Sequence, residues 1–130
     1  MTPNEYQALA MRTNDGKDKE RLNGFSCKVA VVNSMRNRPI NEAELICGAM
    51  GLNGEAGEVV DLIKKIVFHG HEFDVNAICK ELGDVCWYVA LVCNSLGINL
   101  EDVMQKNIDK LKERYPDGFT EKASINRKID

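Results

Sequence analysis

The sequence has few of the residues that interrupt or cross-link a chain. Its prolines stand only at positions 3, 39 and 116 of 130, which leaves the middle of the chain free of the residue that most often breaks a helix. The five cysteines form no C-x-x-C pair, and their odd number does not fit a closed disulfide framework or a zinc ribbon. We therefore expect reduced thiols and a fold held together by packing.

Charge of one sign and long apolar runs are also scarce. Lysine and arginine together number 17 against 20 for aspartate and glutamate, so no strong cationic field is available for a nucleic-acid polymer or an anionic membrane. The N-terminus lacks the basic and apolar regions of a signal peptide, and no apolar run approaches the roughly 20 residues that span a bilayer. With 44% hydrophobic and 28% charged residues, the composition predicts one packed domain, residues 1–130, in the cytoplasm.

Apolar residues at helical spacing are what the sequence does have, and they predict an all-α fold. Long helices are expected over residues 41–68, 74–96 and 99–115, each opened by an Asn or Asp that can cap it. A short helix is expected over residues 2–11, whereas the charged segment 12–24 is interpreted as a surface loop or a short helix. The polar tail after Phe119 is expected to fray.

The apolar faces of the long helices are too wide for three helices to cover alone. The segment 74–96 has charges only at Asp74, Lys80, Glu81 and Asp84, so we expect this helix to be buried nearly all round. Helices joined by short connections pack antiparallel. We therefore predict an antiparallel bundle of the four-helix type, completed by a homodimer or homotetramer. Residues 1–40 form an N-terminal helix and a variable segment, and residues 41–119 form the bundle core.

Four acidic residues form two pairs with the same spacing. Glu55 and Glu58 are three residues apart in one expected helix, and Glu81 and Asp84 are three apart in the next, so each pair lies on one helix face. A single pair of this kind is usually a solvated position. The stretch 41–61, however, holds five acids and no lysine or arginine, so ion pairs within it cannot neutralise them. Antiparallel helices could bring both pairs together, where they would repel unless a multivalent cation neutralised them.

Glycines recur every three residues through the helix that carries the first acidic pair, at positions 48, 51, 54 and 57. Each costs roughly 0.8–1 kcal/mol relative to alanine in a helix interior. Two explanations stay open: a close approach of helices across a subunit interface, and backbone room for a ligand beside the carboxylates.

The ligand types indicate which cation would fit. Di-iron carboxylate bundles use Glu-x-x-His motifs, but His69 and His71 lie in an expected loop, which disfavours an oxygenase. Carboxylates alone suit Mg²⁺ or Mn²⁺, and Mg²⁺ usually completes its shell with water and substrate phosphates. A phosphorylated substrate needs polar and cationic partners, for which the candidates are Lys65, Asn107, Lys110 and Arg114. The spacing fits a solvated basic face equally well, and either histidine could reach a bound base.

The residues around the acids resemble a known family. Residues 51–61 read GLNGEAGEVVD, 22 residues separate Glu58 from Glu81, and residues 81–88 read ELGDVCWY. With residues 107–111 and 114–116, these motifs are similar to those of the MazG-like all-α nucleoside triphosphate pyrophosphohydrolases. The family's E-x-x-E and E-x-x-D positions fall on Glu55, Glu58, Glu81 and Asp84.

The resemblance implies a reaction and an assembly. The reaction is Mg²⁺-dependent cleavage of a nucleoside triphosphate between the α- and β-phosphates, giving the monophosphate and pyrophosphate, on a bundle that forms dimers or tetramers. The family's substrate contacts fall on Asn107, Lys110 and Arg114. We expect all four acids to serve as metal ligands, Glu55 and Glu58 to be the catalytic pair, and Glu55 to hold or deprotonate the attacking water.

Two other functions are compatible with the acidic pairs. One is a non-enzymatic helical interaction or regulatory module whose acids bind a structural ion; it predicts metal-dependent melting without phosphate release. The other is a redox di-metal enzyme, which spectra taken after iron loading would expose. No spacing rule specifies a base or a sugar.

Overall fold

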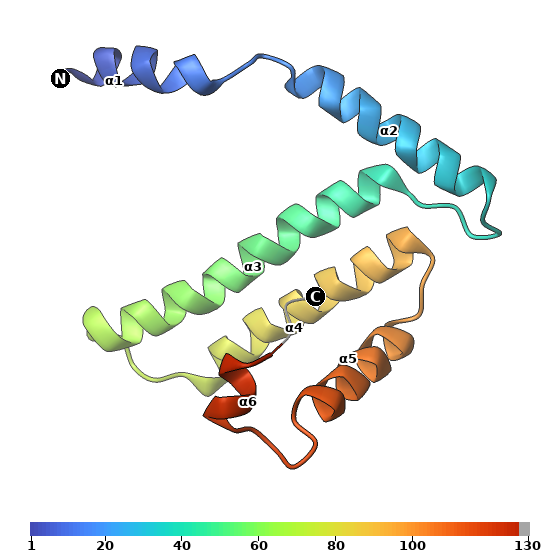
Figure 1. Cartoon of the computed structure of the whole chain (residues 1–130). Helices are drawn as coiled ribbons and strands as arrows, with labels where there is room; N and C mark the ends of the chain where they lie inside the picture. Colours follow the sequence, from blue (N-terminus) through green and yellow to red (C-terminus); the bar gives the residue numbers. More distant parts are fainter. Residues whose placement is uncertain (128–130) are drawn as a thin grey trace. The chain divides into compact units, whose positions relative to one another are not determined.

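The computed structural model describes residues 1–127, which form helices and no strand (Figure 1). The all-α prediction is therefore confirmed. The chain divides into two compact units, Met1–Ile40 and a second unit that begins at Asn41, and each is described by itself. Within the described residues no helix has both the length and the apolar character needed to cross a membrane.

The first unit contains the helix α1 (Pro3–Ala10), a 3₁₀ turn η1 (Met11–Thr13) and the helix α2 (Asp18–Ser34). Helix α1 begins as predicted, because the Thr2 hydroxyl accepts a hydrogen bond from the Glu5 amide while the Glu5 carboxylate accepts one from the Thr2 amide. The interpretation of residues 12–24 as a loop or short helix is confirmed for residues 12–17 and wrong from Asp18, where α2 begins and continues to Ser34. Its apolar residues do not follow a regular helical stripe, so periodicity gave no signal.

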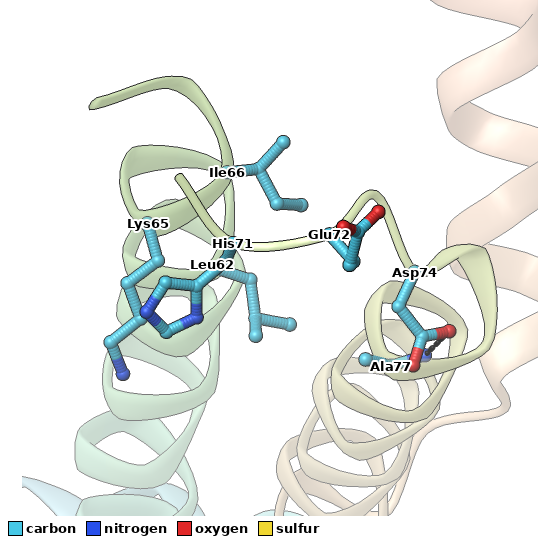
Figure 2. Close-up of a pocket in the computed structure, with 7 residues that line it drawn as sticks. All are labelled: Leu62, Lys65, Ile66, His71, Glu72, Asp74 and Ala77. Atoms are coloured by element: carbon cyan, nitrogen blue, oxygen red, sulfur yellow. Dashed lines mark hydrogen bonds between the residues drawn. The ribbon is translucent and has the colours of Figure 1, made fainter. Parts of the chain in front are cut away.

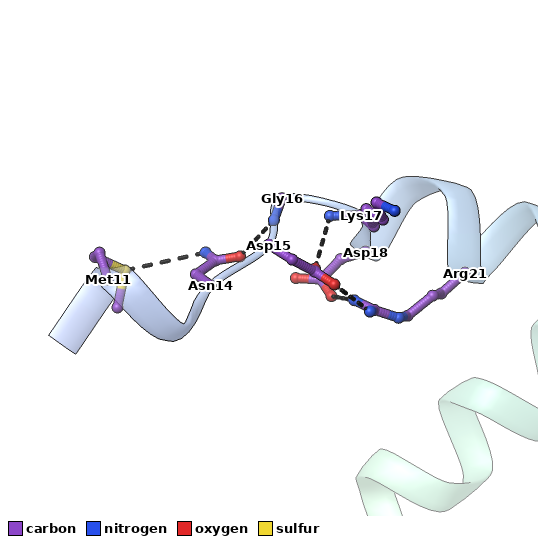
Figure 3. A network of polar contacts seen from close by, with 7 residues as sticks. All are labelled: Met11, Asn14, Asp15, Gly16, Lys17, Asp18 and Arg21. Carbon is purple, nitrogen blue, oxygen red and sulfur yellow. Dashed lines mark hydrogen bonds and ion pairs between the residues drawn. The ribbon is translucent and has the colours of Figure 1, made fainter.

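Side chains around one arginine organise the start of α2 (Figure 3). Asp15 accepts a hydrogen bond from the Lys17 amide at 3.1 Å and forms an ion pair with Arg21, which also lies 3.4 Å from Asp18. The Arg21 guanidinium lowers the pKa of the Asp15 carboxyl below its usual value. Because this pair spans six residues rather than one helical turn, the capping pattern used to predict helix starts does not detect it.

The second unit contains α3 (Glu42–Phe68), α4 (Val75–Leu96), α5 (Leu100–Arg114) and α6 (Glu121–Ile125). The three long helices have the predicted bounds, and two of their caps act as expected: Asn41 accepts a hydrogen bond from the Glu44 amide, and Asp74 accepts two. The capping prediction is wrong for Asn99, whose side chain accepts no amide hydrogen bond and instead donates to Asp102 at 3.2 Å. Gly97 ends α4 in the left-handed conformation at φ +62°. The prediction that the tail frays is wrong for α6, which Thr120 caps. Residues 128–130 of that tail lie outside the described residues.

Helices α3 and α4 lie side by side and antiparallel (Figure 1), and two glycines of α3 allow the close approach. A Cβ atom at Gly48 would lie 2.9 Å from Val92 Cγ2, and one at Gly51 would overlap the ring of Tyr88. These two glycines therefore serve helix packing within one chain, which neither explanation from the sequence had named. Gly54 and Gly57, one and two turns further on, would meet nothing within 4 Å among the described residues.

The start of α3 is also tied to the end of α4 by polar contacts. The Asn41 amide donates a hydrogen bond to the Ser95 carbonyl at 2.7 Å, and the Asn94 side chain donates one to Glu44 Oε2 at 3.2 Å. Ser95 is completely buried and its hydroxyl donates to the Val92 carbonyl. These contacts fix the register of the two helices at the end where the connection from the first unit enters.

The expectation that α4 is buried nearly all round is wrong for the single chain. Trp87 is 59% exposed and Leu82 is 47% exposed, and α5 also leaves Met104, Ile108 and Leu111 exposed. One neighbouring helix covers only one stripe of α4, so these apolar residues stay exposed among the described residues of the second unit. The four-helix arrangement and its completion by a second copy stay predictions.

Replacing Gly51 with alanine is expected to lower the free energy of unfolding by about 1 kcal/mol or more, because the added methyl group displaces Tyr88. Gly54→Ala is the matched control in the same helix; with open space around it, it should raise stability by about 0.5–1 kcal/mol through helix propensity. Urea denaturation measures both. Equal stability of the two variants would mean that α3 and α4 do not approach closely at Gly51.

Candidate metal centre

Three carboxylates from two helices meet on the facing sides of α3 and α4. Glu55 of α3 and Glu81 and Asp84 of α4 each offer an oxygen, and these oxygens all lie within 4.8 Å of one another. Glu55 and Glu81 are half-buried and Asp84 is exposed. The structure thus brings three of the four predicted acids together, because the register of the antiparallel pair sets Glu55 opposite the Glu81–Asp84 turn.

The electrostatics of this cluster favour a cation. Partial burial raises the pKa of Glu55 above its usual value, and the charges of Asp84, Glu81 and Glu58 raise it further. Among the described residues, Glu55, Glu81 and Asp84 form no ion pair with a lysine or arginine that would offset this repulsion. A set of close carboxylate oxygens without nitrogen or sulfur donors fits a hard divalent cation such as Mg²⁺ or Mn²⁺.

Glu58 lies beside the cluster of three and is not part of it. It is exposed, and its charge acts on both Glu55 and Lys65. Its predicted roles as a metal ligand and catalytic residue stay predictions.

One acid of α3 is neutralised in a way that the sequence analysis missed. Asp61 pairs with Lys64 at 2.5 Å and with Lys65 at 2.6 Å, and these lysines lower its pKa to about 2. The expectation that ion pairs within residues 41–61 cannot satisfy their acids holds for Asp61, whose partners lie just beyond that stretch. The signal was present, because spacings of three and four residues place both lysines within reach of Asp61.

The predicted substrate contacts come from two helices. Lys65 extends from α3 and is held by Asp61, while Asn107, Lys110 and Arg114 belong to α5. Asn107 and Lys110 are exposed and Arg114 is half-buried. These positions leave the α5 residues accessible to a ligand, and their role stays a prediction.

Comparison with known proteins matches the region that carries this cluster. The model of the MazG nucleotide pyrophosphohydrolase domain matches residues 49–119, more than half of the chain. The chain belongs to the MazG nucleotide pyrophosphohydrolase family. The "Gene 37 protein" of Mycobacterium phage L5 is 40% identical over 85 residues, which is 60% of this chain and 72% of the phage protein. No solved structure matches the chain.

The family match confirms the resemblance seen in the motifs and covers every predicted site residue. Membership of the MazG family indicates nucleotide pyrophosphohydrolase activity, and this family generally depends on a divalent metal, which agrees with the cluster of Glu55, Glu81 and Asp84. The matched region begins within α3 and ends after α5, so the first unit lies outside it.

Replacing Glu55 with glutamine is expected to raise the melting temperature of the metal-free protein at neutral pH. The raised pKa of Glu55 means that folding favours its protonated form, so the stabilisation from that form is present below the ordinary value of 4.5 and is lost as the pH rises through the raised pKa. Glutamine removes the repulsive charge at neutral pH, and the difference from the wild type should shrink as the pH falls below 4.5.

Thermal melts in chelator and in Mn²⁺ measure this effect. The wild type should gain more from Mn²⁺ than Glu55→Gln does, because the variant lacks one carboxylate ligand. Glu101→Gln, which changes an exposed acid of α5, is the control and should respond to Mn²⁺ as the wild type does. A Glu55→Gln protein that melts lower than the wild type in chelator would contradict the repulsion.

Proposed function

We propose that this MazG protein is a Mg²⁺-dependent nucleoside triphosphate pyrophosphohydrolase, for which Mn²⁺ can substitute. Water and a ribo- or deoxyribonucleoside triphosphate give the nucleoside monophosphate and pyrophosphate. The observation that supports this best is the meeting of Glu55, Glu81 and Asp84 within the family-matched region. Three facing carboxylates cost stability unless a cation binds them, and a cation held this way keeps room for phosphate oxygens.

Glu55, Glu81 and Asp84 would hold the metal, and Glu58, one turn from Glu55, would complete the ligand set. A divalent cation bound there would neutralise charge on the phosphate oxygens and lower the pKa of a bound water. Carboxylate oxygens that start within 4.8 Å of one another need little rearrangement to share one ion.

Glu55 is the residue best suited to accept a proton from the attacking water. Its carboxylate lies in the cluster with Glu81 and Asp84, within reach of a water that an ion bound there would hold, and an ionised carboxylate can accept the proton. The water oxygen forms a bond to phosphorus while the anhydride bond between the α- and β-phosphates breaks in line with it. Glu55 Oε takes the proton that the water releases, and pyrophosphate leaves with the bonding electron pair.

Positive and amide groups would hold the polyphosphate. Lys110 and Arg114 lie four residues apart on α5, on one side of the helix, and Asn107 lies one turn before Lys110. Lys65 approaches from α3, where Asp61 already orients its ammonium group. A phosphate would share Lys65 with Asp61, so this residue positions substrate while keeping its ion pair.

We also propose that two or four copies assemble, in the cytoplasm. Support for assembly comes from the exposed apolar residues of α4 and α5, among them Leu82, Trp87 and Ile108. Large apolar side chains left exposed on a helix are common where another chain packs against it. Support for the location comes from the five cysteines, which are all free and therefore suit a reducing compartment.

The activity is tested by measuring pyrophosphate released from a panel of nucleoside triphosphates with Mg²⁺, with Mn²⁺ and with chelator. Glu58→Gln should lose at least 100-fold in kcat, as expected for a metal-site acid, and remain folded by circular dichroism. Glu101→Gln should keep the wild-type rate. Metal-dependent stabilisation without pyrophosphate release from any substrate would favour the non-enzymatic module instead.

Assembly is tested by changing the exposed indole of α4. Trp87→Lys should shift the molar mass measured by light scattering to that of a single chain of 14.6 kDa, because a charge cannot be buried at an apolar interface without a large cost. Trp87→Phe keeps an apolar ring and should keep the wild-type mass. A wild-type protein that elutes as a single chain at all concentrations would contradict the proposed assembly.

A further inference from the structure

A cavity of about 420 Å³ lies where α3 ends and α4 begins (Figure 2). Its apolar wall consists of Leu62 and Ile66 from α3 and Ala77 from α4. Glu72 and Asp74, from the connection between the helices, line it with carboxylates. His71 from the same connection and Lys65 from α3, whose ammonium group pairs with Asp61, complete the lining. Figure 2 shows Leu62 and Ile66 projecting from α3 toward the side of this connection. An apolar wall with a few polar groups is typical of a pocket for a small molecule.

The cavity continues the helix faces that carry the metal centre. Leu62 follows Glu58 by four residues and Glu55 by seven, while Ala77 precedes Glu81 by four. Residues at these spacings share a helix face, so the cavity begins about one turn, roughly 6 Å, beyond Glu81 on α4 and about two turns, roughly 10 Å, beyond Glu55 on α3. A sugar ring spans a step of this length between a phosphate and a base. A nucleotide whose phosphates lie at the metal centre can therefore place its base here.

The connection is built to hold its acids over the cavity. The His71 amide donates a hydrogen bond to the Lys65 carbonyl at 3.2 Å, which carries the chain back across the end of α3. Gly70 makes this reversal with φ +72°, a conformation that residues with a side chain rarely adopt. Asp74 is held in turn because its Oδ1 caps α4 by accepting from the Asn76 and Ala77 amides.

Carboxylate oxygens of Asp74 and Glu72 remain available to a ligand. Asp74 uses Oδ1 for the cap, and no hydrogen bond to Oδ2 is formed within residues 1–127. The Glu72 side chain forms no hydrogen bond or ion pair with the described part of the chain. Ionised carboxylates only accept hydrogen bonds, so they select a ligand edge that donates.

We propose that this cavity is the base pocket of the enzyme and that Glu72 and Asp74 select bases with an exocyclic amino group. The inference rests on the proposed pyrophosphohydrolase function. Cytosine, adenine and guanine each donate from an exocyclic amino group. Uracil, thymine and hypoxanthine have no amino group, and their ring N–H donor stands directly beside a carbonyl oxygen, which a carboxylate repels. The substrate class is therefore an amino-bearing nucleoside triphosphate.

Substrate analogues that cannot be cleaved test base binding independently of the hydrolysis reaction. The probes are α,β-methylene analogues of dCTP and dUTP, measured by calorimetry with the wild-type protein in Mg²⁺. The cytosine analogue should bind at least about tenfold more tightly, the discrimination expected of one base-edge contact. Glu72→Gln should remove most of this ratio, because an amide can also donate to the uracil carbonyl.

Two further variants locate the base. Asp74→Asn retains a good helix cap and should also reduce the ratio, whereas Glu101→Gln should leave it unchanged. Ala77→Leu fills the cavity with a strong helix former and should weaken both analogues about tenfold while the Mn²⁺-induced rise in melting temperature stays at the wild-type value. That combination would place the base in the cavity and the metal outside it.

The outcomes distinguish the proposed base pocket from the proposed pyrophosphohydrolase reaction. Equal affinity for the two analogues, no binding of either, or a preference that both acid variants retain would overturn the base pocket. Unchanged affinity in a folded Ala77→Leu protein would overturn it as well. If the cytosine analogue is preferred as expected but neither dCTP nor dUTP releases pyrophosphate, the base pocket stands and the proposed reaction fails.

Discussion

The close antiparallel packing of α3 on α4 is the constraint on which the rest of the structure depends. It requires glycine where the helices come nearest, at Gly48 and Gly51, and it is held in register by the bond from Asn41 to Ser95. Because both helices are rigid over many turns, a register set at one end determines which residues face one another at the other end. The acids and the cavity beyond them are consequences of that register.

The same packing creates an electrostatic cost. Glu55 is half-buried against Glu81 and Asp84, and the repulsion among them is expressed as a raised pKa of Glu55. Such a cluster lowers the stability of the metal-free protein. The same carboxylates would stabilise the protein if they bound a divalent cation. Asp61, one turn beyond Glu58, shows the opposite solution, since Lys64 and Lys65 neutralise it within α3.

The two proposed sites follow one another along the pair of α3 and α4. The carboxylate cluster lies in the middle of the pair, and the cavity lies toward the connection at residues 69–74, with Lys65 of α3 in its wall. This order matches the proposed order of groups in a bound nucleotide, with phosphates, sugar and base in succession. The connection matters here because it contributes Glu72 and Asp74, the carboxylates of the cavity.

By itself, the sequence determined the bounds of the three long helices of the second unit and the family, and it singled out the four acids as candidates, because breakers and motif spacing are local properties of the chain. It did not reveal α2, whose apolar residues lack periodicity, nor the reason for Gly48 and Gly51, which depends on Val92 and Tyr88 some forty residues away. Only the tertiary structure decided that Glu55 joins Glu81 and Asp84 while Glu58 stays beside them, and that Glu72 and Asp74 share a cavity. The physical reason is that these relations depend on the register and spacing of two packed helices, which the periodicity within either helix does not specify.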